Sequence, residues 1–195
     1  AEIAAVWSLA GATPPPAEAA VALGDAGSGR GLVACSPVRT GDVLVRVPWD
    51  AVVCVLDSAD GSDAALAREL LATIGGAGES SLRAEVWRRY AELLDRDTGA
   101  AALWDESEID ELQWEPGVLA AAELRSRFER EAEVSGGDDM RWAMAVVHSR
   151  SFAAELPGGG GRVRALAPIC DLFNHRPESP AEAAASDERR GGAES

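Results

Sequence analysis

The stretch LAPICDLFNH at residues 166–175 joins an apolar run to a short polar segment. Apolar residues dominate positions 163–169, and we expect this part of the chain to be extended. Asp171 and Asn174 flank two apolar residues, and side chains of both types often form hydrogen bonds to nearby backbone groups at turns. Taken alone, they are either ordinary turn residues or polar groups that face a ligand.

Arg150 is a second candidate because it stands near the end of a predicted, largely apolar helix at residues 139–152. An arginine at this position usually interacts with the negative end of the helix dipole. This local role is the ordinary interpretation. A binding role needs support from other parts of the chain.

A glycine cluster occupies residues 24–31, with single glycines at positions 27, 29 and 31. A dinucleotide site needs a strand, a glycine-rich turn and then a helix whose N-terminus faces the pyrophosphate. The cluster does not have the G-x-G-x-x-G spacing, and residues 32–35 predict a strand in place of the helix. The cluster therefore indicates a hairpin turn.

Metal and thiol chemistry would have to use Cys35, Cys54, Cys170, His148 and His175. Cys170 and His175 are close in sequence, but no second pair completes a zinc site. A hydrolase could pair Cys170 with His148, yet nothing in the sequence brings them together or supplies an oxyanion hole. We therefore expect no metal site and three free thiols, which suits a reducing compartment.

The composition restricts the partners. All 18 basic residues are arginine, and the net charge is −15. Such an acidic chain should repel nucleic acid, and without lysine it can form neither a phosphate loop of the G-x-x-x-x-G-K type nor a Schiff base. The charge either attracts a basic protein partner or only maintains solubility. No apolar stretch reaches the roughly 18 residues that cross a membrane, so no membrane partner is expected.

Hydrophobic periodicity predicts an α+β layout in which short, mostly antiparallel strands come first, a helical block follows, and the chain then returns to extended structure. The predicted strands are residues 21–23, 32–35, 43–47 and 51–56. The predicted helices are residues 1–10, 64–74, 82–94, 117–134 and 139–152. Residues after Pro177 are rich in Ala, Glu, Ser and Gly and are predicted to be disordered.

Four stretches in this order resemble the SET domains of the Rubisco large-subunit methyltransferase group. The first is WSL at residues 7–9 with a glycine at position 11. The second is GRGLVA at 29–34 with GDVLVRVP at 41–48, and the third is RWAMAVVHSRSF at 141–152. The fourth is LAPICDLFNH, whose Asn-His pair is the most specific part. The resemblance covers roughly residues 5–178.

The resemblance implies a SET-domain fold and transfer of a methyl group from S-adenosylmethionine to a protein amine, usually lysine and in one relative histidine. It implies that backbone groups of Arg30, Gly31 and Leu32 line the methionine end of the cofactor. By the same resemblance, Arg150 helps to hold the cofactor's polar end, and Asp171 supports the Asn-His turn and belongs to the cofactor-binding set. Asn174 and His175 would fix the cofactor, Asn174 by its side chain and His175 through its backbone.

The sequence departs from the family pattern after His175. The family continues with a GE-x-x-x-x-YG stretch that carries its catalytic tyrosine, whereas residues 176–195 contain no aromatic residue and the sole tyrosine is Tyr90. We therefore assign no catalytic residue and expect a C-terminally truncated SET domain. The expected division is residues 1–178 for the N-terminal part of that domain, 79–136 for its helical insert and 179–195 for a disordered tail.

The expected function is that of an S-adenosylmethionine-dependent protein-lysine N-methyltransferase acting on a basic or lysine-containing protein segment. The alternative is a non-catalytic SET-like module that binds a basic partner, and a histidine-directed enzyme is a third possibility. The expected location is intracellular, in plastid, cytosol or nucleus. The sequence predicts neither the oligomeric state nor the number of methyl groups added.

Overall fold

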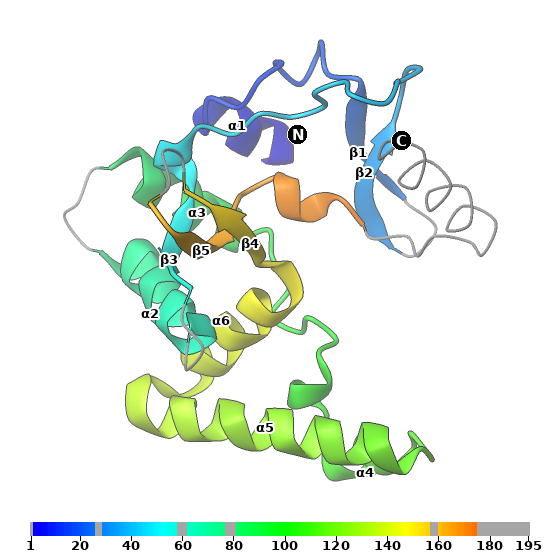
Figure 1. Ribbon diagram of the computed structural model, residues 1–195, viewed down its shortest axis with the longest axis vertical. Helices are drawn as coiled ribbons and strands as arrows, with labels where there is room; N and C mark the ends of the chain where they lie inside the picture. The colour runs from blue at the N-terminus through cyan, green and yellow to red at the C-terminus, as the bar shows by residue number, and fades with distance from the viewer. Residues whose placement is uncertain (1, 26–28, 58–61, 77–80, 157–159, 175–195) are drawn as a thin grey trace, which may run out of the picture.

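The fold combines two small antiparallel sheets with a block of helices (Figure 1). The computed structural model describes residues 2–25, 29–57, 62–76, 81–156 and 160–174. The predicted α+β class is confirmed, because short antiparallel strands lie on either side, in sequence, of a block of helices. None of the helices in these ranges is long and apolar enough to cross a membrane.

The N-terminal helix and hairpin match the sequence prediction. Helix α1 (Glu2–Leu9) buries Val6 and Trp7, and strands β1 (Val21–Asp25) and β2 (Arg30–Ala34) pair in an antiparallel register. Gly24 allows this register because a Cβ at that position would lie 2.7 Å from a methyl carbon of Val33. The hairpin stands at one end of the molecule beside α1 (Figure 1).

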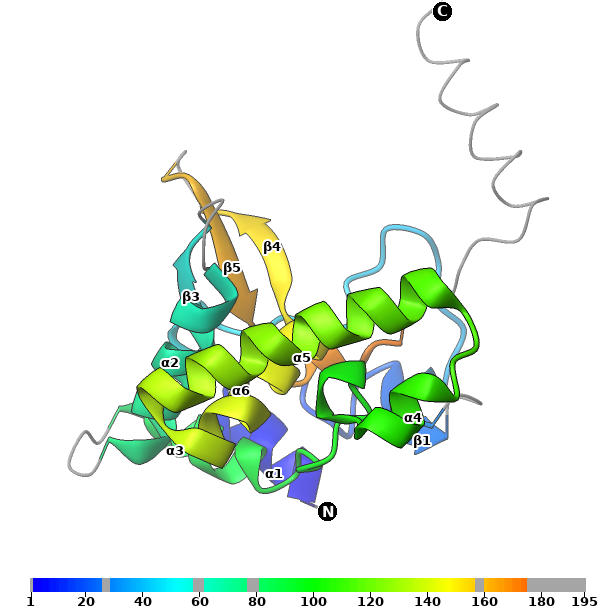
Figure 2. The same ribbon diagram turned by 90° about the horizontal axis from the view of Figure 1, so that it is seen from below.

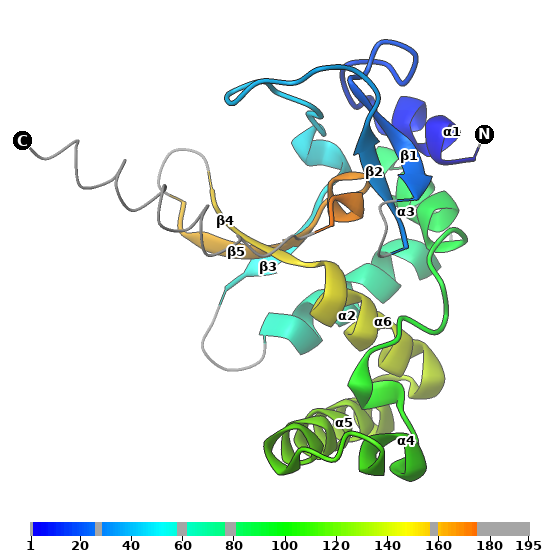
Figure 3. The same cartoon turned by 90° about the vertical axis from the view of Figure 1, so that its right-hand side faces the viewer.

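The second sheet has the order β3-β5-β4 and joins distant parts of the sequence. Its strands are β3 (Val53–Leu56), β4 (Phe152–Glu155) and β5 (Arg162–Leu166), and both pairings are antiparallel. The strands predicted before the helical block therefore do not form one sheet, because β3 pairs with β5 and not with the N-terminal hairpin. Figure 3 shows this sheet projecting away from the hairpin.

Two local predictions are also wrong. The segment at 43–47 is not a strand, because its only described pairing is an isolated bridge between Thr13 and Arg46. The helix predicted at 139–152 ends at Arg150, because Ser151 is extended and Phe152 begins β4. Leu44, Val45 and Val47 still pack against the core, whereas Val43 is exposed, so most of the hydrophobic pattern is satisfied without a sheet.

The remaining helices are α2 (Ser62–Gly75), α3 (Leu82–Ala91), α4 (Glu106–Asp110), α5 (Glu115–Ser135) and α6 (Gly137–Arg150). Of these, α2 and α5 pack against α6, α3 packs on α2, and α4 packs on α5. Helix α6 contacts α2 and α5 and is buried from Trp142 to Val147, so it forms the centre of the core. Helix α5 covers it on the outer side, with α4 beside it (Figure 2).

Described residues 81–136 are mainly helical, in line with the helical insert predicted at 79–136, although its boundaries stay a prediction. The tail predicted at 179–195 lies outside the described residues. The fold matters for function at one point. The end of α6, strand β2, the last turn of α3 and the short 3-10 helix η4 (Cys170–Leu172) converge between the hairpin and the three-stranded sheet (Figure 1).

Candidate functional site

The site is centred on an ion pair between Arg150, the last residue of α6, and Asp171 of η4. Arg150 donates from Nη1 to Asp171 Oδ2 over 3.1 Å. The Asp171 side chain is only 2% exposed, whereas that of Arg150 is 24% exposed. Arg150 thus does more than interact with its own helix dipole: it neutralises a buried carboxylate and still reaches the surface.

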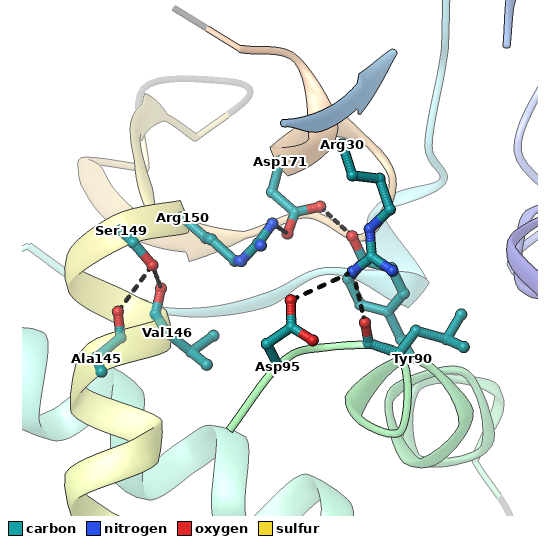
Figure 4. Close-up of polar contacts among 9 residues, drawn as sticks. Arg30, Tyr90, Asp95, Ala145, Val146, Ser149, Arg150 and Asp171 are labelled. Atoms are coloured by element: carbon teal, nitrogen blue, oxygen red, sulfur yellow. Dashed lines mark hydrogen bonds and ion pairs between the residues drawn. The ribbon is translucent and has the colours of Figure 1, made fainter. Parts of the chain in front are cut away.

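Tyr90 of α3 provides the second partner of this carboxylate. Its hydroxyl donates to Asp171 Oδ1 over 2.5 Å, so Asp171 lies between Tyr90 and Arg150 (Figure 4). The Tyr90 ring is fully buried and packs edge-on against Trp87, with ring centroids 5.5 Å apart. Burial, and then the charge of Asp171, raises the pKa of Tyr90 far above its ordinary value. The hydroxyl is therefore a permanent donor.

Asp171 is held in an environment that opposes its ionisation. Burial raises the pKa of its carboxyl above the ordinary value, against the opposing effects of Tyr90 and Arg150. Both described hydrogen bonds of the carboxylate go to protein groups. This arrangement agrees with a supporting role for Asp171, and its membership of the cofactor-binding set stays a prediction.

The turn that leads into η4 is strained. Ile169 is fully buried and has φ 74° and ψ −45°, a conformation that β-branched residues rarely adopt. Such backbone costs on the order of 1–3 kcal/mol and is most common at functional sites. The strained turn places Asp171 two residues later, within reach of both Tyr90 and Arg150.

Strand β2 meets the same region from the hairpin. The Arg30 guanidinium donates to the Leu93 carbonyl oxygen over 2.8 Å and lies 3.9 Å from Asp95 (Figure 4). Its side chain therefore points to the end of α3. That backbone groups of Arg30, Gly31 and Leu32 line a cofactor stays a prediction. Gly31 is buried, and Leu32 packs against the core. Strand β2 also contacts η4.

The other predicted residues lie differently. Asn174 follows η4 and is exposed, whereas His175 lies outside the described residues. His148 is exposed on α6 and packs edge-on against Phe128. Burial raises the pKa of the Cys170 thiol, which disfavours the reactive thiolate. Among the described residues, no group of three His, Cys, Asp or Glu side chains could hold a metal ion.

Tyr90 is the residue that the sequence did not reveal as part of the site. It lies 81 residues from Asp171, within the helix predicted at residues 82–94. One signal was present, because a tyrosine on a buried face needs a hydrogen-bond partner for its hydroxyl. The sequence could not say which partner.

Solved structures identify the fold of the chain. The structure described as the SET domain of LSMT bound to MeLysine and AdoHcy superposes with a TM-score of 0.68 over 90% of this chain, at 21% sequence identity. The chain has a SET-domain fold. A second structure, Rubisco LSMT bound to AdoMet, gives a TM-score of 0.64 over the same share of the chain and the same identity.

Sequence comparison leads to the same group. The SET domain described here is 26% identical to the chloroplastic N-methyltransferase of the ribulose-1,5-bisphosphate carboxylase/oxygenase large subunit from Pisum sativum over 171 residues. That alignment covers 75% of this chain and 33% of the pea protein, and the structural matches cover 45% of theirs. The chain thus spans less than half the length of these relatives. No protein-family model matches it. The predicted resemblance to Rubisco-methyltransferase-like SET domains is confirmed.

Proposed function

We propose that this SET domain serves an S-adenosylmethionine-dependent protein-lysine N-methyltransferase. The observation that carries the proposal is the Arg150–Asp171 pair beside β2, in a fold whose solved relatives are described as bound to AdoMet, or to AdoHcy with methyllysine. The residues that meet there are those that the family motifs assign to the cofactor. Strand β2, α6 and η4 each contribute one part.

The donor set fits the amino-acid end of the cofactor. Arg150 offers a cation for its carboxylate, because Asp171 takes up only one described guanidinium N–H and 24% of the side chain is exposed. The exposed Asn174 amide offers an oxygen acceptor for its ammonium group, and the β2 backbone offers further polar groups. When bound, S-adenosylmethionine supplies an activated methyl group.

The acceptor is proposed to be a lysine in a basic protein segment. The chain carries a net charge of −15, so long-range attraction favours a positively charged partner. The protein part of the site would orient the amine and exclude water from it. No catalytic residue is assigned among the described residues. An intracellular location, with the plastid one option beside cytosol and nucleus, remains the expectation.

Calorimetric titration of S-adenosylhomocysteine into the purified chain tests the proposal. We expect saturable binding with a Kd between about 1 μM and 1 mM. Arg150→Ala and Asn174→Ala should each weaken it, Arg150→Ala by at least about tenfold because a charge-assisted hydrogen bond is lost. Arg141→Ala is the matched control: this arginine lies on the same helix and pairs with Asp138 at the surface.

The outcomes separate the candidate functions. Binding that is lost in the two site variants and retained in Arg141→Ala supports the methyltransferase. A wild-type chain that circular dichroism shows to be folded, but that binds no S-adenosylhomocysteine, would contradict it. The non-catalytic module that binds a basic partner would then be the better account of the fold.

A further inference from the structure

Three segments that are far apart in sequence meet at one carboxylate. Tyr90 comes from α3, Asp171 from η4 and Arg150 from the end of α6, and Figure 4 shows Asp171 between the other two. Only Arg150 of the three is partly exposed, whereas the Asp171 side chain and the Tyr90 ring are buried. Two hydrogen bonds therefore connect the buried hydroxyl of Tyr90, through Asp171, to the guanidinium of Arg150 at the surface.

The turn that follows α3 also anchors the opposite side of the site. Leu93, three residues after Tyr90, accepts a hydrogen bond from the Arg30 guanidinium of β2. Tyr90 and Arg30 both line a cavity of about 140 Å³ between α1, the hairpin and α3. The segment from Tyr90 to Leu93 therefore contacts both β2, through Arg30, and η4, through Asp171, the two segments that are expected to face the cofactor.

We propose that Tyr90 is a positioning residue of the cofactor site: its hydroxyl fixes Asp171, and Asp171 in turn fixes the guanidinium of Arg150 toward the ligand. This inference rests on the proposed function and deepens it. Tyr90 itself touches no ligand in this account. Its effect reaches the cofactor through two hydrogen bonds, from Tyr90 to Asp171 and from Arg150 to Asp171.

The physical reason lies in the number of donors available to a buried carboxylate. Each oxygen of Asp171 has one described side-chain donor, Tyr90 on Oδ1 and Arg150 on Oδ2. Without the tyrosine hydroxyl, Oδ1 would be left without its donor, which is costly in a buried position. Asp171 would then turn to share Arg150 or take up a proton, and either change alters the orientation of the guanidinium.

Tyr90→Phe is the direct test because it removes the hydroxyl and keeps the ring that packs against Trp87. We expect its affinity for S-adenosylhomocysteine, measured by calorimetry on the 195-residue chain, to fall about tenfold, in line with the loss of a hydrogen bond to a charged group. Phe128→Leu is the control for general destabilisation. Phe128 is fully buried on α5, which packs on α6 and α4, so this variant should lose stability and keep its affinity.

A double-mutant cycle tests whether Tyr90 acts through Arg150. If it does, Tyr90→Phe should have little effect on the remaining binding of Arg150→Gln, so that the two changes are clearly non-additive. If the losses of affinity in the two single variants simply add in the double variant, Tyr90 does not act through Arg150. A tyrosine that only stabilises the fold would affect binding independently of Arg150.

The pH dependence of binding supplies a readout that a purely structural role would not change. The groups described around Asp171 are Tyr90 on α3, Arg150 on α6 and the neighbouring Cys170 thiol on η4. The tyrosine hydrogen bond lowers the pKa of Asp171, so its removal should move the acid-side loss of affinity to higher pH in Tyr90→Phe.

The results distinguish the positioning role of Tyr90 from the proposed methyltransferase function. If the wild-type chain binds S-adenosylhomocysteine and Tyr90→Phe binds it equally well with the same pH profile, the positioning role is wrong and the proposed function stands. If the folded wild-type chain does not bind at all, both fail. A tenfold loss with non-additivity and a shifted pH profile supports both.

Discussion

The junction of α3, α6 and η4 and the helical segment around α5 both use arginine–carboxylate pairs, but in different surroundings. At the junction, the Asp171 side chain is 2% exposed. On α5, Arg125 and Glu129 form an i,i+4 pair whose side chains are 33% and 42% exposed. The comparison shows that the chemical type of a contact does not decide its importance. Burial decides it, because water competes for the charges of the Arg125–Glu129 pair and does not reach the carboxylate of Asp171.

The largest effect is expected for Arg150→Leu. It leaves Asp171 buried without its cation. The free energy of unfolding should fall by about 3 kcal/mol, as when one partner of a buried ion pair is removed in other proteins. Urea denaturation followed by tryptophan fluorescence measures the change. The double variant Arg150→Leu, Asp171→Asn should recover part of the loss, because the unpaired charge is then gone. A loss below about 1 kcal/mol would show that the pair behaves like a surface pair.

Asp63 tests an intermediate case. Its carboxylate is 18% exposed, accepts a hydrogen bond from Arg127 of α5 over 2.5 Å and forms an ion pair with Arg164 of β5 at 3.1 Å, so it ties α5 to the sheet. Asp63→Asn should lower the free energy of unfolding by about 1–2 kcal/mol, because one charge-assisted hydrogen bond and one further ion pair are weakened. Asp138→Asn, whose carboxylate is exposed, is the control. Equal losses in the two variants would count against burial as the deciding variable.

Two aspartates should give opposite pH dependences of stability. Burial raises the folded-state pKa of Asp171, so its contribution to stability falls as pH rises from the unfolded pKa of about 3.9 through the raised value. The Ser107 hydroxyl, and then the Glu108 N–H, lowers the pKa of Asp105. Its contribution is therefore present above about pH 3.9 and is lost as pH falls through the lowered value.

Urea denaturation between pH 3 and 7 of Asp171→Asn and Asp105→Asn checks these signs. Relative to wild type, Asp171→Asn should gain stability with rising pH, whereas Asp105→Asn should lose it. If the stability difference from wild type changes with pH in the same direction for both variants, burial does not determine the pKa of Asp171.

The smallest effect is expected at the surface of α5. Arg125→Ala removes one exposed i,i+4 pair, and the free energy of unfolding should change by no more than about 0.5 kcal/mol. Thermal melts at low and high salt measure it, and the difference should shrink in salt. A change above about 1 kcal/mol would mean that the α5 pairs are coupled into a network.

The sequence predicted those parts of the fold that depend on local patterns. Helix α1, the β1–β2 hairpin and the four longer helices follow from apolar periodicity and from glycines at their ends. Strand β4 could not be predicted in this way, because its pairing with β5 decides where α6 stops. The segment at 43–47 has the pattern of a strand and lacks a partner strand, and a strand exists only by pairing.

The candidate site divides in the same way. Motif resemblance identified Arg150 and Asp171, and the structure brings their side chains together. The donor on the other carboxylate oxygen, Tyr90, belongs to no motif that was identified. Its partner depends on how α3 packs beside η4, which a pattern along one segment does not contain.

The pairing of β3 with β5 also determines the order in which the site can form. Residues 53–56 meet residues 163–166, about a hundred positions later in the chain. Closing a loop of this size costs about 4 kcal/mol of chain entropy before any long-range contact compensates. Asp171 follows β5 directly, so it reaches Tyr90 only after this closure. We expect the hairpin and helices to form early and the binding site to be completed last, which pulse-labelled hydrogen exchange at β3 would reveal as late protection, because the described pairing of β3 is with β5.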